Sequence, residues 1–207
     1  MTENLKEIKK DLAKKLKKER FEHTEGVMYT AAALAMRYDE DIEKALTAGL
    51  LHDCGKFCPP KDQIKLCEKK GILLTDSEKE MPALIHAKLG AYLAEHEYGI
   101  RDESILNAIT YHTTGRPDMT MLEKIIYIAD YIEPNRKIIP GLDEVRRLSF
   151  TDINQAVCLS AGATTRYLKN GGKSVDPMTI QTYNFYKKEK WYESVKRNGK
   201  DRLSCTK

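Results

Sequence analysis

The chain has 207 residues, of which 41% are hydrophobic and 32% are charged, and its net charge is +4. These values exclude a disordered chain, and no apolar run is long enough to span a bilayer, so we expect one soluble globular domain with a real core. The five cysteines are odd in number and unevenly spaced, which is typical of reduced thiols and predicts a cytoplasmic protein without membrane contact.

Helical patterns follow one another along the chain. Leu5, Ile8, Leu12 and Leu16 recur at steps of three and four residues, which predicts an amphipathic helix over residues 3–20 with lysines on its outer face. Caps, glycines and prolines divide the remainder. Five further helices are expected over residues 22–38, 61–70, 82–98, 102–112 and 120–132. Four others are expected to run from a cap at residue 39 or 41 to residue 52, from after residue 141 to about 148, from a cap at Thr151 to residue 171, and from residue 177 to about 195.

No segment shows two-residue alternation between hairpin turns, so the sequence predicts an all-α fold. We expect residues 1–20 to form an N-terminal amphipathic helix packed on the domain, residues 21–196 to form the domain, and residues 197–207 to form a frayed tail. Seven lysines lie between residues 6 and 18 without aromatic residues among them. This pattern indicates a solvated helix face, so we do not expect a nucleic-acid partner.

The adjacent His52 and Asp53 stand at the end of an apolar run, and Gly55 and Lys56 follow them. Small residues one and two turns earlier share the helix face of His52, so other helices can approach closely and enclose the pair. A buried carboxylate needs a partner for its charge. Imidazole and carboxylate together suit a borderline transition metal such as iron, manganese or zinc.

Three other histidines, His23, His86 and His112, also have small or apolar neighbours on their predicted helix faces. One inward histidine is usually a hydrogen-bonded core residue, but four of them with acids indicate a functional site. His96 is different, because it lies roughly 80° around the helix from His86 and stands between two glutamates.

Asp130 lies within an apolar helix, residues 125–132, that leaves little room for a solvated face. It is either a buried, hydrogen-bonded aspartate or a metal ligand. The order His23, His52-Asp53, Asp130 is the signature of the HD metal-dependent phosphohydrolase superfamily. Segments 23–27, 50–53, 112–117 and 127–136 together resemble the bacterial YqeK family, and the similarity runs from about residue 10 to about residue 186.

Members of the YqeK family hydrolyse diadenosine tetraphosphate symmetrically into two ADP. The resemblance therefore implies an all-α, HD-domain helical bundle that acts as a symmetrical bis(5'-nucleosyl)-tetraphosphatase, with a dinucleoside polyphosphate as substrate and ADP as product. It implies one transition-metal ion, with iron favoured over manganese, zinc or magnesium. The metal ligands that it implies are His23, His52, Asp53 and Asp130.

The resemblance also implies a set of substrate contacts. One departure concerns Asp176, where the family often has histidine, so contact of this loop with the base or ribose stays open. The implied substrate-binding residues are Arg20, Lys56, His86, His112, Thr113, Arg136, Lys173, Val175, Asp176 and Pro177.

A cation held by two imidazoles and two carboxylates keeps open positions at which water loses a proton near neutral pH. Phosphoryl transfer then needs in-line attack and neutralisation of charge, for which Lys56 and Arg136 are the cationic candidates. His86 and His112 can ligate a second metal, or bind phosphate and donate a proton. We favour the second role, so the expected catalytic residues are Asp53, Lys56, His86 and His112.

Three other functions compete with this prediction. The chain could be an HD phosphohydrolase for another small nucleotide, such as a nucleoside triphosphate or a cyclic dinucleotide. It could be a nucleotide-binding regulator with an intact metal site, or a basic RNA-binding protein, which would leave the inward histidines unexplained. The exposed helical surface would also allow a homodimer.

Overall fold

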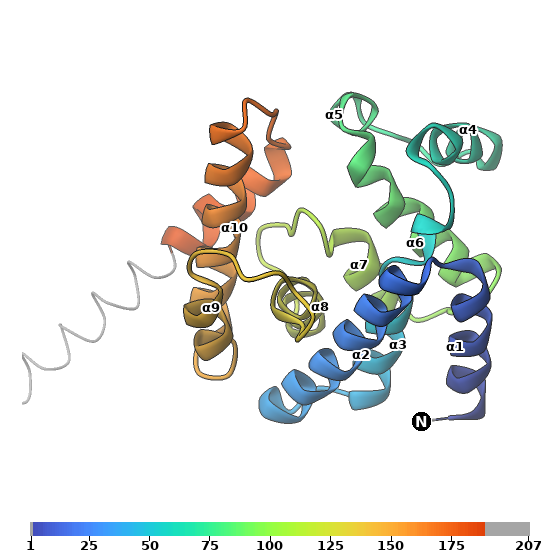
Figure 1. Ribbon diagram of the computed structural model, residues 1–207, viewed down its shortest axis with the longest axis horizontal. Coiled ribbons are helices and arrows are strands. Elements are labelled where there is room, and N and C mark those ends of the chain that lie inside the picture. The colour runs from blue at the N-terminus through green and yellow to red at the C-terminus, as the bar shows by residue number, and fades with distance from the viewer. Residues whose placement is uncertain (1, 189–207) are drawn as a thin grey trace, which may run out of the picture.

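The computed structural model describes residues 2–188, which form helices and loops without a strand (Figure 1). This confirms the expected all-α fold. None of the described helices is long and apolar enough to cross a membrane. The α-helices are α1 (Glu3–Lys15), α2 (Lys18–Tyr38), α3 (Ile42–Leu51), α4 (Pro60–Lys70), α5 (Asp76–Glu80), α6 (Ile85–His96), α7 (Glu103–Tyr111), α8 (Met121–Ile132), α9 (Leu142–Ser149) and α10 (Ile153–Asn170), with 3-10 turns η1 (Cys54–Phe57) and η2 (Pro82–Leu84) and a last helix over residues 177–188.

Helix α8 lies in the middle of the fold. It packs on α2, α3 and α7 on one side and on α9 and α10 on the other, as Figure 1 shows. Its sequence is apolar around most of its circumference, as expected for a helix buried between layers. Helix α2 runs along α3, and Gly49 permits this closeness, because a β-carbon there would lie 2.9 Å from the Cα of Met28.

One predicted helix end and two predicted helix starts need correction. The expected helix over residues 3–20 ends at Lys15, because Leu16 is extended and turns its buried side chain into the core. Helix α2 therefore begins at Lys18 rather than at residue 22. Helix α10 is capped by Asp152 and not by Thr151, since the Asp152 carboxylate accepts a hydrogen bond from the backbone N–H of Gln155.

The predicted helix 82–98 is two elements, a 3-10 turn from Pro82 followed by α6, and the short α5 before it was not predicted. The expectation for residues 177–195 can be followed only to residue 188, where the described part of the chain ends. The frayed tail expected over residues 197–207 lies outside the described residues, and the division into three parts stays a prediction.

Gly55 is needed for a close approach and not for a left-handed turn. In the turn η1 it lies against the backbone of α6, and a β-carbon would collide with the carbonyl oxygen of His86 and lie 3.0 Å from the backbone nitrogen of Gly90. These neighbours are backbone atoms, which cannot rotate away. Gly55 therefore sets the distance between the His52-Asp53 segment and α6.

We expect Gly55→Ala to lower the free energy of unfolding by about 1–3 kcal/mol, the usual cost of overpacking a tight interior. Thermal unfolding followed by circular dichroism measures the change. Gly171→Ala is the matched control, because a β-carbon at Gly171 would have no neighbour nearer than 3.4 Å. Equal stability of the two variants would contradict the account of Gly55.

An ion pair ties α3 to the start of α7, since Lys44 Nζ lies 2.8 Å from Asp102 Oδ2. The hydrogen bonds from Lys44 and Ser104 lower the pKa of Asp102 to about 2. A carboxyl whose pKa is depressed by folding stabilises the fold above its unfolded pKa and loses that contribution as the pH falls through its folded pKa.

We therefore expect Asp102→Asn, which can still cap α7, to be less stable than the wild type at neutral pH. The difference should shrink as the pH falls from about 4 through about 2, because Asp102 is protonated first in the unfolded state and then in the folded state as well. Urea unfolding at a series of pH values tests this. A difference that stays constant across that interval would contradict it.

Candidate active site

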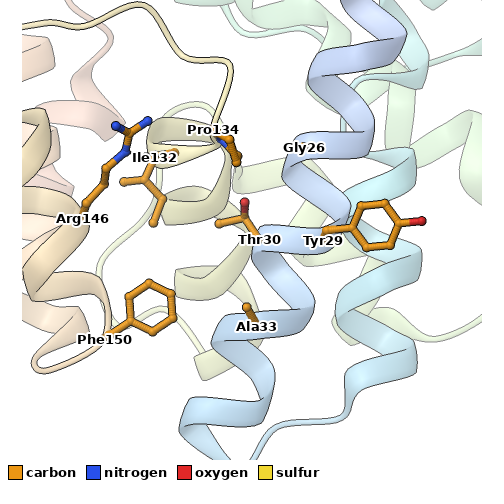
Figure 2. A pocket seen from close by; sticks show the side chains of 8 residues that line it. All are labelled: Gly26, Tyr29, Thr30, Ala33, Ile132, Pro134, Arg146 and Phe150. Carbon is orange, nitrogen blue, oxygen red and sulfur yellow. Dashed lines mark hydrogen bonds between the residues drawn. The ribbon is translucent and has the colours of Figure 1, made fainter.

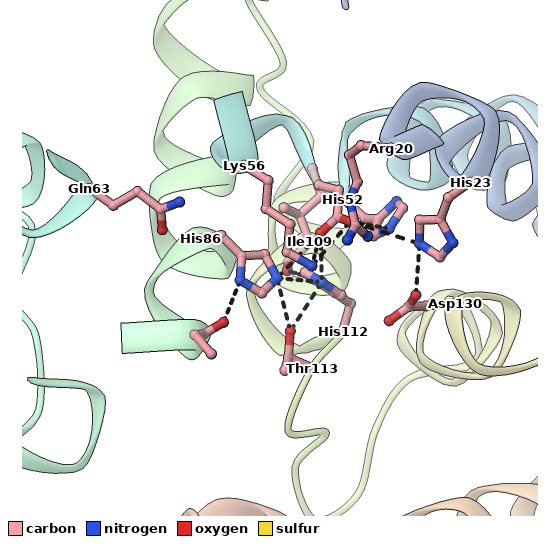
Figure 3. Close-up of polar contacts among 12 residues, drawn as sticks. Arg20, His23, His52, Lys56, Gln63, His86, Ile109, His112, Thr113 and Asp130 are labelled. Carbon is pink, nitrogen blue, oxygen red and sulfur yellow. Dashed lines mark hydrogen bonds and ion pairs between the residues drawn. The ribbon is translucent and has the colours of Figure 1, made fainter. Parts of the chain in front are cut away.

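Asp53 is buried among polar side chains. Figure 3 labels the residues that gather around it, namely Arg20, His23, His52, Lys56, His86 and His112. Asp53 follows the end of α3, and its side chain is 1% exposed. Two cations reach it from the surface: Arg20 Nη1 lies 2.8 Å from Oδ2, and Lys56 Nζ lies 2.9 Å from Oδ1. Both cationic side chains are only partly buried, so each joins the buried carboxylate to solvent.

Four histidines direct their Nε2 atoms at the same carboxylate. The distances from Nε2 to the nearer printed Asp53 oxygen are 3.3 Å for His86, 3.4 Å for His52, 3.6 Å for His112 and 3.8 Å for His23. The four come from different elements, namely α6, the ends of α3 and α7, and α2. The structure therefore brings together histidines that are up to 89 positions apart in the sequence.

Three of these histidines are oriented by their own backbone. In each, Nδ1 lies 2.7 Å from the carbonyl oxygen three residues earlier, so Nδ1 carries the proton and Nε2 presents a lone pair to Asp53. Two of them stand at the C-termini of helices, where backbone carbonyls have no helical partner. The pairs are His52 with Gly49, His86 with Ala83, and His112 with Ile109.

His23 is oriented by two carboxylates of the α8 segment. Its Nε2 lies 3.0 Å from Asp130 Oδ1, and its Nδ1 lies 3.1 Å from Glu133 Oε1. Asp130 was expected at this site from the sequence, whereas no site role was predicted for Glu133. The signal that could have found Glu133 is its spacing, because it follows Asp130 by three residues and so lies one turn further along the same face.

The two aspartates are held ionised. Burial alone would raise the pKa of Asp53, but the positive charges that face it, Lys56 among them, outweigh burial and hold that pKa well below the usual range. Burial likewise opposes the ionisation of Asp130, and its contact with His23 outweighs it and lowers its pKa. The site therefore presents two carboxylates at neutral pH.

The surroundings of the histidines shift their pKa values in different directions. Burial lowers the pKa of His52, and burial together with the nearby Lys56 charge lowers the pKa of His86 well below its ordinary value. Burial would also lower the pKa of His23, but Asp130, Asp53 and Glu133 outweigh it and raise that pKa. Neutral imidazoles at His52 and His86 are the form that binds a metal ion.

The cluster fits a divalent metal ion. His23, His52 and Asp130 form one group, and His52, Asp53 and His112 form another, in which the potential ligand atoms lie within 4.8 Å of one another. The Nε2 atom of His52 is buried and has no hydrogen-bond partner in the described part of the chain. Because a buried lone pair normally has a partner, an ion bound there would satisfy it.

His86 and His112 form the other side of the cluster with Thr113. Their Nε2 atoms are 3.1 Å apart, and both present lone pairs because both Nδ1 atoms donate to carbonyls. The Thr113 hydroxyl lies 3.1 Å from His112 Nε2 and 3.3 Å from His86 Nε2, so it can donate to one of them. The structure therefore brings these three side chains together, and their predicted role in binding substrate stays a prediction.

The remaining predicted residues do not contact this cluster in the part of the chain that the structure describes. Arg136 lies close enough to Tyr131 that its charge partly offsets the rise that burial causes in the pKa of Tyr131. In the loop before the last helix, Lys173 and Pro177 are exposed and Val175 is half-buried. No hydrogen bond or ion pair joins these four residues to the buried carboxylates.

Asp176 has a local structural role. Its Oδ2 accepts a 2.5 Å hydrogen bond from the Ser77 hydroxyl of α5, and its Oδ1 accepts one of 2.8 Å from the backbone N–H of Met178 at the start of the last helix. Both carboxylate oxygens are thus engaged in joining two segments. His96, which the sequence set apart from the site, is half-exposed and stacks on Tyr92.

A separate cavity of about 640 Å³ lies behind the site, between α2 and the α8–α9 segment (Figure 2). Its walls are mainly apolar. Gly26 lies between this cavity and the site, because a β-carbon added at Gly26 would meet the carboxylate of Glu133. The lining residues are Gly26, Tyr29, Thr30, Ala33, Ile132, Pro134, Arg146 and Phe150.

Known proteins share both the sequence and the fold. Residues 20–135 match the family model described as HD domain. A protein of Bacillus subtilis named symmetrical bis(5'-nucleosyl)-tetraphosphatase is 49% identical over 172 residues, which are 82% of this chain and 90% of that protein. A protein of Staphylococcus aureus with the same name is 37% identical and covers 88% of this chain and 94% of its own length.

A solved structure agrees with these matches. The crystal structure of a predicted HD superfamily hydrolase involved in NAD metabolism, from Clostridium acetobutylicum, superposes with a TM-score of 0.85 at 42% identity. It covers 89% of this chain and 97% of the neighbour. The buried His-Asp cluster, the helical fold and these similarities together show that the chain belongs to the HD-domain family and, within it, to the YqeK family of symmetrical bis(5'-nucleosyl)-tetraphosphatases.

Proposed function

We propose that this protein hydrolyses diadenosine tetraphosphate at its central phosphoric anhydride bond and releases two ADP. The relatives that carry this activity in their names match more than four fifths of the chain. The observation that carries the proposal is the convergence of four histidine Nε2 atoms on the buried Asp53, since this donor set fits the metal ion that an HD domain implies.

His23, His52, Asp53 and Asp130 are the proposed ligands of that ion, and iron is the proposed metal. Two imidazoles and two carboxylates form a mixed nitrogen–oxygen set that suits iron, with manganese, zinc and magnesium as alternatives. When bound, a divalent ion at such ligands activates water and polarises a phosphoryl oxygen. The residues around it hold the substrate and neutralise its charge.

Arg20 and Lys56 are the proposed phosphate-binding cations. Each contacts Asp53 and is partly exposed, with side-chain exposures of 37% and 29%, so each can also face an anionic substrate that approaches from solvent. Charge on the phosphoryl oxygens is the main obstacle to this reaction, and fixed cations stabilise it without reorganisation. Arg136, at the end of the α8 segment, is proposed to bind a phosphate further along the chain of four.

His86, His112 and Thr113 are proposed to bind the bridging or leaving phosphate. The lowered pKa of His86 makes it neutral, with its donor hydrogen already given to Ala83, so it contacts substrate through Nε2. The two Nε2 atoms are 3.1 Å apart, so a proton released by the attacking water would be held between them and then passed to the departing ADP oxygen. In this proposal Asp53 is a ligand of the metal ion, and His86 and His112 transfer a proton.

The loop residues Lys173, Val175, Asp176 and Pro177 are proposed to contact the nucleoside. Asp176 is the weakest of these assignments chemically, because both of its oxygens already accept hydrogen bonds. Lys173 and Val175 have no such engagement of their side chains in the described part of the chain. The loop would then recognise a nucleoside mainly through apolar contact and the Lys173 charge.

We also propose that the protein works in the cytoplasm and forms a homodimer. Cys54, Cys58 and Cys67 are thiols outside any disulfide in the described part of the chain, which fits a reducing compartment. The large apolar side chains Tyr29, Met36 and Phe150 are exposed, and such surface can be covered by a second copy. Light scattering of the purified protein tests the dimer.

Product analysis tests the proposed reaction. Iron-loaded protein, prepared without oxygen and given diadenosine tetraphosphate, should release ADP alone. Asp53→Asn should abolish turnover, because it removes the charge at the centre of the site, and circular dichroism establishes that this variant is folded. ATP plus AMP as products would place the cut elsewhere, and full activity of Asp53→Asn would reject the metal-dependent mechanism.

A further inference from the structure

His23 obtains its orientation differently from the other three histidines of the site. It is the sixth residue of α2 and lies inside the helix, so the carbonyl three residues earlier is already part of the helical hydrogen-bond pattern. His52 and His112 stand at helix C-termini, and His86 follows a 3-10 turn, where such a carbonyl is available. His23 therefore needs an acceptor from another element.

Glu133 supplies this acceptor. It directly follows α8, is 2% exposed, and places Oε1 3.1 Å from His23 Nδ1. Its second oxygen, Oε2, accepts a 2.7 Å hydrogen bond from the backbone N–H of Asn135. Both oxygens are therefore used, and the carboxylate is fixed by the backbone of its own turn.

Gly26 makes room for this carboxylate. It lies one turn after His23 in α2, and a β-carbon there would be 2.5 Å from Glu133 Oε2 and 3.4 Å from its Cδ. Any larger residue at position 26 would push the carboxylate away from its present position. The close approach of α2 to the end of α8 thus depends on a residue without a side chain.

The α8 segment therefore holds both nitrogens of one imidazole. Asp130 faces Nε2 and Glu133 faces Nδ1, and the two acids are three residues apart. A carboxylate on Nδ1 fixes the tautomer and ring orientation and makes Nε2 a stronger electron donor. Among the four histidines, only His23 has a charged residue in this position.

We propose that Glu133 is a positioning residue for His23, which it holds in the tautomer and orientation needed to bind the metal ion, and that Gly26 is required for this contact. The inference rests on the proposed role of His23 as a ligand. It extends the site by one buried carboxylate that touches neither the ion nor the substrate.

Titration of the metal-free, full-length protein with Mn²⁺, with free ion measured by electron paramagnetic resonance, tests this directly. Glu133→Ala should weaken binding about 10–100-fold, the usual effect of losing such a partner. Glu133→Gln keeps an acceptor for Nδ1 and should weaken binding less. Gly26→Ala should resemble Glu133→Ala, although every proposed ligand is intact.

Glu123→Gln is the matched control. Glu123 is also a buried glutamate of α8, 1% exposed, but it pairs with Arg116 rather than with the site. We expect this variant to melt at a lower temperature and to bind Mn²⁺ as the wild type does. Melting of each metal-free variant separates loss of stability from loss of affinity.

The outcomes separate the two proposals. If the wild type binds Mn²⁺ and both Glu133 variants bind it equally well, the positioning role is wrong and the metal site stands. If Glu133→Ala weakens binding no more than Glu123→Gln does, the effect is one of stability alone and the inference also fails. If the wild type itself binds no ion, the proposed metal site is rejected, and the inference with it.

Discussion

The buried negative charge of Asp53 is the constraint on which the rest of the structure depends. Burying a carboxylate to 1% exposure costs free energy unless cations or hydrogen-bond donors surround it. Arg20 and Lys56 provide charge, and the surrounding histidines provide nitrogen atoms at 3.3 to 3.8 Å. Those imidazoles present lone pairs as well, so Asp53 and its neighbours form a set of donors to a cation. The same features that make the cluster expensive to bury make it suitable for a metal ion, and the family of this chain uses such ions for hydrolysis.

The ends of helices orient the histidines around Asp53. Helices α3 and α7 both end directly before an inward histidine, and a carbonyl without a helical partner fixes each ring. Gly55 then allows η1 to touch α6, which carries His86 into the same space. Helix α8 is buried between two layers and supplies the acids that face His23. The last helix packs against the segment after His112, where the Thr182 hydroxyl lies 3.0 Å from the carbonyl oxygen of Thr114.

Much of this could be predicted from the sequence. Histidines with small or apolar neighbours were expected to point inward, and Asp130 lies in a helix with little room for a solvated face, so both were found by pattern and by resemblance. The contact of Glu133 with His23 was missed because it joins residues 110 positions apart. The break at Leu16 was missed because the apolar spacing continues through it, although the core requires an extended residue there. The role of Asp176 depends on Ser77, which no local pattern connects to it.

Anomalous X-ray diffraction at the iron edge, from crystals of the iron-loaded protein, locates the metal ion. We expect one strong peak among the side chains of His23, His52, Asp53 and Asp130. A peak located instead between His86 and His112, or no peak in protein that retains its fold, would contradict this expectation.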